Sequence, residues 1–130
     1  LMDIVIDFDG TVVSHEFPLI GKDIGSIPVL KKILQNGHRL ILFTMRCNSK
    51  RGMYLDDAID WFFQNGIMLY GVQTNPSQKS WTTSPKAYGQ LMIDDAALGC
   101  PLKKDVNISD RPFVNWEEVE KIMQQNGIIK

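Results

Sequence analysis

Four short apolar runs recur along the chain, and each is followed by a polar segment that contains acidic residues, glycine or proline. The runs cover residues 4–6, 39–45, 67–72 and 90–95. Runs this short, bounded by turn-forming residues and rich in β-branched or aliphatic side chains, are typical of buried strands rather than helices. The pattern therefore predicts four strands.

Apolar residues between and after these runs recur at helical spacing. One predicted helix carries Ile27, Leu30 and Ile33 on one face, a second covers residues 53–65, and a third begins after Asn115. Strands that alternate with helices predict a parallel sheet with right-handed crossovers. At 130 residues, the chain is expected to form a single domain, residues 1–130.

The first apolar run ends in two carboxylates, Asp7 and Asp9, and Gly10 follows as a natural turning point. Side chains two residues apart on a strand share a face, so both carboxylates face one reaction centre if the strand stays regular to Asp9. One carboxylate could attack an electrophile while the other exchanges a proton with the leaving group. Such close charges need a proton or a cation between them, and Mg²⁺ suits oxygen ligands best.

The segment DFDGTV at residues 7–12 resembles the first motif of the haloacid dehalogenase (HAD) superfamily. Most members of that family are Mg²⁺-dependent phosphohydrolases, in which the first Asp is the nucleophile and the second is the general acid/base. The resemblance covers about residues 3–95 in motif order. It implies an α/β fold: a three-layer Rossmann-like parallel sheet with helices on both faces, here without room for a cap domain.

Three further pieces of the HAD pattern are expected downstream, and the chain has a candidate for each. Thr44 ends the second apolar run, where the family places a hydroxyl group. Asp94 and Asp95 end the fourth run, where the family completes its Mg²⁺ site, with Asp94 as the direct ligand. Lys86 directly precedes that run and is preferred over Lys79 as the lysine that pairs with the phosphate.

The resemblance implies a phosphatase that acts on a small phosphorylated substrate through an aspartyl-phosphate intermediate. The implied catalytic residues are Asp7, Asp9, Thr44 and Lys86. The implied metal-binding residues are Asp7, Asp9 (through its backbone carbonyl), Asp94 and Asp95. The residues expected beside the substrate are Gly10, Thr11, Arg46 and Trp81. The sequence does not name the substrate.

Two loops are expected to cover the site. Residues 14–25 are interpreted as a flap over the carboxylates, in which His15 is expected to be solvated. Residues 73–85 form a long loop whose Trp81 either stacks on the substrate or pins the loop to the core. Arg46 either holds a substrate anion through its planar guanidinium group or is a surface charge.

Composition narrows the range of partners. A net charge of -1 offers no electrostatic case for nucleic acid or an anionic membrane, and no apolar run is long enough to cross a bilayer. No basic-then-apolar leader is visible. Cys47 and Cys100 form neither a metal-type cluster nor a disulfide framework, so a reduced cytoplasmic setting is expected. A homo-oligomer is compatible with the sequence.

Two alternatives use the same residues. A non-catalytic binding or scaffold protein of this fold could retain every motif residue. A response-regulator receiver also combines acids, Mg²⁺, a Thr and a Lys, but it carries its phosphorylated Asp at the end of the third strand. Here the third run ends at Val72, and Gln73 and Thr74 follow with no acid, which disfavours the receiver.

Overall fold

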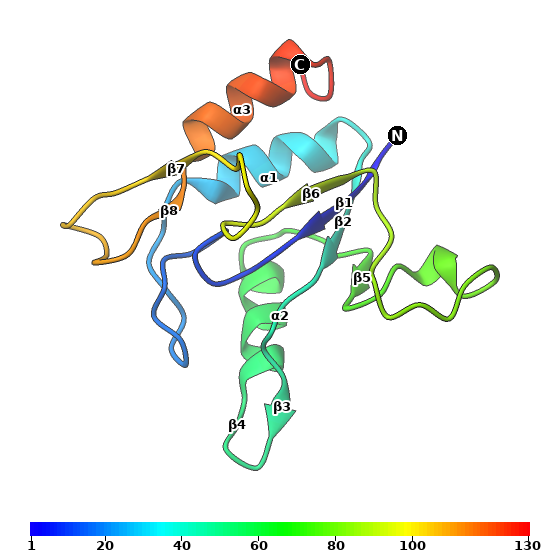
Figure 1. Ribbon diagram of the computed structural model, residues 1–130, viewed down its shortest axis with the longest axis horizontal. Helices are drawn as coiled ribbons and strands as arrows, with labels where there is room; N and C mark the ends of the chain where they lie inside the picture. The colour runs from blue at the N-terminus through cyan, green and yellow to red at the C-terminus, as the bar shows by residue number, and fades with distance from the viewer.

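A four-stranded parallel sheet lies at the centre of the computed structural model, which describes all residues 1–130 (Figure 1). Its strands are β1 (Asp3–Ile6), β2 (Arg39–Leu42), β5 (Gly71–Val72) and β6 (Leu91–Ile93). Their spatial order is β5-β2-β1-β6. Each of the four predicted strands is present, but the third covers only Gly71–Val72 of the predicted residues 67–72. Strands β1 and β6, which precede the two acidic pairs, are direct neighbours.

Three helices connect or follow these strands, as the periodicity predicts. They are α1 (Ser26–Gln35), α2 (Tyr54–Gln64) and α3 (Trp116–Gln125). The smaller elements are the hairpin strands β3 (Asn48–Ser49) and β4 (Gly52–Met53), the hairpin strands β7 (Leu102–Lys103) and β8 (Phe113–Val114), and the 3₁₀ helix η1 (Pro76–Gln78). The chain thus has a Rossmann-like α/β fold. None of its helices combines the length and hydrophobicity needed to span a membrane.

The two faces of the sheet are covered differently. Ile4 and Ile6 of β1 belong to the main core, together with the buried apolar side chains of all three helices. Val5 and Ile41 belong to a smaller cluster with Ala87, which lies in the crossover from β5 to β6. The expectation of helices on both faces is not confirmed, because no helical residue belongs to the smaller cluster.

The segment of residues 14–25, called the flap below, folds back on itself after β1. The Ser14 amide donates to the Lys22 carbonyl at 3.1 Å, and the Lys22 amide donates to Ser14 Oγ at 2.8 Å. Ser26 is the first residue of α1. Its hydroxyl donates to the Val12 carbonyl at 2.7 Å and ties the helix to the base of the flap.

No additional domain interrupts the chain where β1 or β2 ends. The link from β1 to α1 holds only the flap, with isolated bridges that pair Val13 with Asp9 and with Asp23. The link from β2 to α2 holds only the β3–β4 hairpin. The carboxyl ends of β1 and β6 are therefore flanked by short segments alone.

Candidate metal and phosphate site

Three carboxylates meet where β1 and β6 end. Asp7 follows β1, and Asp94 and Asp95 follow β6. One oxygen from each carboxylate lies within 4.8 Å of the others. The parallel pairing continues beyond the strands, because the Asp7 amide donates to the Ile93 carbonyl at 3.1 Å. Register between neighbouring strands thus brings together residues that are nearly ninety positions apart in the sequence.

The Thr11 hydroxyl lies between two of these acids. Its Oγ1 is 2.8 Å from Asp7 Oδ2 and 3.0 Å from Asp95 Oδ1, and the Asp95 amide donates to it at 3.1 Å. A hydroxyl carries one proton, so Thr11 can donate to only one of the carboxylates at a time. The Trp116 Nε1 donates to the Thr11 carbonyl at 2.7 Å. Thr11 therefore links the acids to each other and to α3.

Burial is the main cause that raises the pKa of Asp7, and the adjacent Asp95 and Asp94 also raise it. The hydrogen bond from Thr11 lowers it, and the resulting pKa is about 7. Burial also acts to raise the pKa of Asp95. Hydrogen bonds with Asp7, His15 and Thr11 outweigh it and leave the pKa of Asp95 below its ordinary value. Below about pH 7, the metal-free cluster therefore holds a proton on Asp7 beside Asp95, whose pKa is lowered. A divalent cation would relieve the same crowding of negative charge.

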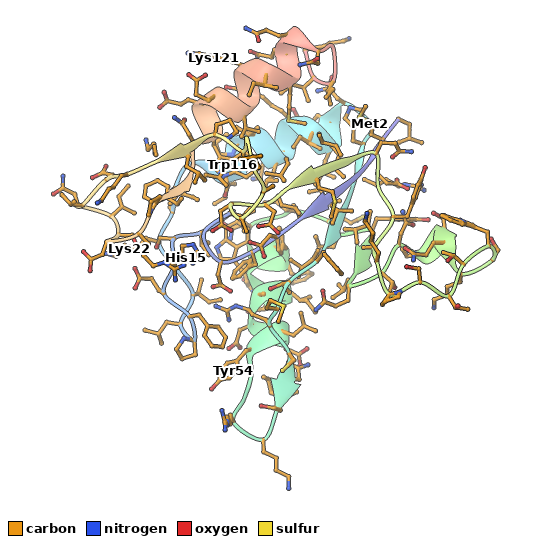
Figure 2. The ribbon with its side chains drawn as sticks, in the orientation of Figure 1. Met2, His15, Lys22, Tyr54, Trp116 and Lys121 are labelled. Atoms are coloured by element: carbon orange, nitrogen blue, oxygen red, sulfur yellow. The ribbon has the colours of Figure 1, made fainter.

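His15 is not the solvated loop residue that the sequence suggests. Its ring is half-buried, and its Nε2 lies 2.9 Å from Asp95 Oδ2. The ring approaches the backbone of Gly10 so closely that a Cβ at Gly10 would lie 1.9 Å from His15 Nε2. Gly10 also has a φ of 79°, where other residues are strained. Figure 2 labels His15 on the segment that follows β1.

Asp9 is held apart from the three-acid cluster by Arg46. Arg46 Nε donates to Asp9 Oδ2 at 2.8 Å, and Arg46 Nη2 donates to Asp9 Oδ1 at 2.8 Å. The remaining N–H groups of Arg46 donate to the carbonyls of Pro18 at 3.4 Å, Leu19 at 2.8 Å and Tyr54 at 3.2 Å. The Arg46 side chain is 1% exposed, so the expectation of a surface charge is wrong. All five donors are occupied, and none is free for a substrate anion.

The regular strand ends before it reaches Asp9. Strand β1 stops at Ile6, and Phe8 is fully buried against the rings of Trp61 and Phe62, with centroid distances of 5.7 Å and 5.9 Å. Asp7 and Asp9 therefore do not share one centre in this conformation, and only the first belongs to the acid cluster.

Thr44 lies beyond the end of β2 and is fixed by Gln73, a residue that sequence reasoning missed. The Thr44 amide donates to Gln73 Oε1 at 2.8 Å, and Gln73 Nε2 donates to the Thr44 carbonyl at 2.7 Å. Gln73 has a φ of 66°, the one non-glycine residue with a positive φ. Its position directly after the third apolar run, at the same edge as the other site residues, is the signal that could have identified it.

The crossover of residues 73–90 runs to the opposite edge of the sheet. The Gln90 amide donates to the Asp3 carbonyl at 2.9 Å, and Asn75 Nδ2 donates to Asp3 Oδ2 at 2.8 Å. Asp3 begins β1, whereas Asp7 follows its end, about 13 Å away along an extended strand. Figure 1 shows this segment, with η1, on the side of the sheet opposite to the ends of β1 and β6.

Lys86, Lys79 and Trp81 all belong to this crossover, and all three are exposed. Neither lysine forms an ion pair, and the charges that shift the pKa of Asp7 come from acids rather than from a lysine. Trp81 stacks edge-on against Tyr88 at a centroid distance of 5.3 Å. The structure does not bring these three expected site residues to the acid cluster.

The fold and the cluster define an α/β protein with a candidate metal site at the carboxyl edge of a Rossmann-like sheet. Among solved structures, the chain is similar to that of a conserved protein coded by a locus of Bacteroides thetaiotaomicron, with 31% sequence identity and a TM-score of 0.75. The match covers 96% of this chain and 91% of that one. The chain belongs to the same family as that conserved protein. No protein-family model and no curated protein matches the chain.

Proposed function

We propose that this protein is a Mg²⁺-dependent phosphohydrolase of the HAD superfamily, with an open active site and no cap domain. It cleaves a small phosphate monoester through an aspartyl-phosphate at Asp7. The observation that carries the proposal is the cluster of Asp7, Asp94 and Asp95 at the ends of adjacent strands. The DFDGTV segment, which resembles the first motif of that superfamily, supplies the first of these acids.

The residues of the cluster fit Mg²⁺. All three donors are carboxylate oxygens, the ligand type that hard cations prefer, and burial leaves their charge poorly solvated. Asp7 and Asp94 would hold the ion, with the backbone carbonyl of Asp9 as a further ligand. Asp95 already contacts Thr11 and His15 and would lie farther out. When bound, the ion supplies charge neutralisation for the phosphate oxygens.

The chain's own residues carry the bond-making steps. The ionised Asp7 carboxylate attacks phosphorus, the bond from phosphorus to the leaving oxygen breaks, and Asp9 gives that oxygen a proton. Asp9 then takes a proton from the water that hydrolyses the aspartyl-phosphate. The Thr44 hydroxyl would donate to a phosphate oxygen. Lys86 and Lys79 have no part in these steps in this geometry, because both lie in the crossover at the far edge.

Hydrolysis of p-nitrophenyl phosphate with and without Mg²⁺ tests the proposal. We expect turnover that requires Mg²⁺ and that is abolished in Asp7→Asn, because an amide cannot attack phosphorus. Asp57→Asn is the matched control, because Asp57 is an exposed acid of α2. Circular dichroism should show that both variants remain folded. Equal activity in Asp7→Asn and the wild type would exclude Asp7 as the nucleophile.

A second candidate function is a non-catalytic, metal-binding member of the same fold. One observation favours it: both oxygens of Asp9 are occupied by Arg46. Mg²⁺ binding measured by calorimetry, together with no turnover on a panel of phosphorylated sugars, nucleotides, amino acids and lipid precursors, would select this candidate.

A further inference from the structure

We infer that Arg46 is a positioning residue, which orients the Asp9 carboxylate and couples that orientation to the flap. The inference deepens the proposed function, on which its kinetic readout rests. It differs from the role that the sequence suggested for Arg46, direct contact with a substrate anion. All five donors of this buried guanidinium group are occupied, by Asp9 on one side and by backbone carbonyls on the other.

Arg46 forms a two-bond fork with the Asp9 carboxylate. Nε and Nη2 each donate to a different oxygen of the carboxylate, both at 2.8 Å. Two parallel bonds of this kind fix the plane of the carboxylate as well as its position. The orientation of the Asp9 carboxylate therefore follows that of the Arg46 guanidinium group.

Arg46 is itself anchored by its remaining hydrogen bonds. Its other donors reach two carbonyls of the flap, at Pro18 and Leu19, and the carbonyl of Tyr54 in the first turn of α2. These three oxygens belong to segments that are separate in the sequence and adjacent in space. Figure 2 labels Tyr54 at the start of α2. Movement of the flap must therefore displace the guanidinium group.

Aromatic rings fix the remaining freedom of the guanidinium plane. The Arg46 Cζ lies 5.0 Å from the ring centroid of Phe8 and 5.1 Å from that of Phe17. Phe17 belongs to the flap and packs edge-on against Tyr54 at 5.2 Å. A planar guanidinium group suits this arrangement of rings and oxygens, whereas a lysine ammonium cannot form the fork.

Together these contacts form a mechanical link. Pro18, Leu19 and Phe17 carry the flap side of the link, and Asp9 carries the catalytic side. A substrate that displaces the flap on entry shifts Arg46, and the two-bond fork carries the Asp9 carboxylate with it. Arg46 needs no contact with the substrate for this role.

A double-mutant comparison tests the link: Arg46→Met, Asp9→Asn and the two combined, assayed with p-nitrophenyl phosphate and Mg²⁺. We expect Arg46→Met to lower kcat by about 10²-fold with little change in KM, because it acts through a general acid. The combined variant should be no slower than Asp9→Asn alone, since Arg46 has nothing left to position. Losses that multiply, or a raised KM with unchanged kcat, would overturn the inference.

Arg39→Met is the matched control. Arg39 forms the same kind of fork, donating to Asp3 through Nε at 2.7 Å and through Nη2 at 3.1 Å, but at the opposite edge of the sheet. Its removal should leave kcat unchanged. Arg46→Lys keeps the charge in a buried position and serves as the second variant if Arg46→Met does not fold. It should show the same loss of kcat, because it lacks the fork.

Hydrogen exchange of the flap amides provides a readout that needs no turnover. Exchange at residues 16–20 should become faster in Arg46→Met and Arg46→Lys and stay unchanged in Arg39→Met. An inactive wild type would remove the proposed function, and the exchange rates would still decide the role of Arg46. Unchanged flap exchange in both Arg46 variants would overturn the coupling.

Discussion

A single carboxyl group, that of Asp7, gives the metal-free protein a distinctive dependence on pH. Burial and its acidic neighbours raise the pKa of Asp7 from 3.8 to about 7. A group whose pKa is raised by folding binds its proton more tightly in the folded state. Its contribution to stability is therefore complete below pH 3.8 and is lost as the pH rises through about 7.

We expect Asp7→Asn to remove this dependence, because asparagine is neutral at every pH and can still donate a hydrogen bond toward Asp95. The free energy of unfolding of the metal-free wild type should fall relative to the variant as the pH rises from 3.8 to about 7. The relative change is roughly 4 kcal/mol at most, from about 1.4 kcal/mol per pKa unit.

Urea unfolding in a chelator, across this pH range, measures the effect. Added Mg²⁺ should restore the stability of the wild type near neutral pH and have little effect on Asp7→Asn. Parallel pH profiles for the two proteins would show that Asp7 is ionised in the folded state throughout.

Asp9→Asn should slow turnover by about 10² to 10⁴-fold, because the leaving oxygen then departs without a proton. The loss should be smaller for p-nitrophenyl phosphate than for phenyl phosphate, whose leaving group needs the proton more. A kcat ratio that is the same for both esters would remove Asp9 from the acid role.

At the scale of elements, the turn after β1 positions most of the site. The Gly10 amide donates to the Val13 carbonyl at 2.8 Å, and the Val114 amide of β8 donates to the Gly10 carbonyl at 3.0 Å. The turn is thereby held from both sides. His15 closes over it and reaches Asp95.

Gly10→Ala should destabilise the protein, both through its positive φ and through collision with the His15 ring. Gly99→Ala is the matched control, because Gly99 has a φ of 91° and open space around it. The backbone conformation alone costs about 1–2 kcal/mol. Thermal unfolding should therefore show a larger loss for Gly10→Ala than for Gly99→Ala. Adding His15→Ala to Gly10→Ala should remove the extra loss of stability relative to Gly99→Ala. If the extra loss remains, contact with the His15 ring is not its cause.

Sequence reasoning predicts the elements well and the side-chain partners less well. The four apolar runs are strands because short β-branched segments have few other ways to bury themselves. Arg46 could not be told from a surface arginine, since three of its partners are backbone carbonyls, which any residue can supply. Lys86 was placed at the site because it precedes β6. The start of a parallel strand, however, lies at the edge opposite to its end.

At the scale of the whole molecule, the two edges of the sheet differ in the polar residues that they carry. The carboxyl edge gathers the acids, while the amino edge is held by a buried polar network. Asp3 accepts from Arg39 and from Asn75, whose Nδ2 also donates to the Tyr88 carbonyl at 3.0 Å. This network, rather than a helix, secures the crossover that covers the second face.

Asn75→Ala should therefore reduce stability and leave catalysis intact. Asn75 is fully buried, and its loss takes one of two donors from Asp3 Oδ2 and the side-chain donor from the Tyr88 carbonyl, at a cost of about 1–3 kcal/mol. The acid cluster lies about 13 Å from Asp3 along β1, so kcat/KM should be unchanged. Ser77→Ala, at a more exposed member of the same turn, should have a smaller effect on the midpoint of unfolding. A drop in kcat with an intact fold would show that the two edges are coupled.

The β3–β4 hairpin has a consequence for how this chain can be extended. Its tip, Lys50 and Arg51, is exposed and points away from the sheet (Figure 1). The entropy of closing a loop rises only slowly with its length, and exposed tips tolerate inserted sequence. The hairpin also begins four residues after Thr44, which follows the carboxyl end of β2. A fluorescent peptide or a whole binding module could therefore be spliced between Lys50 and Arg51, away from the sheet, without loosening the core.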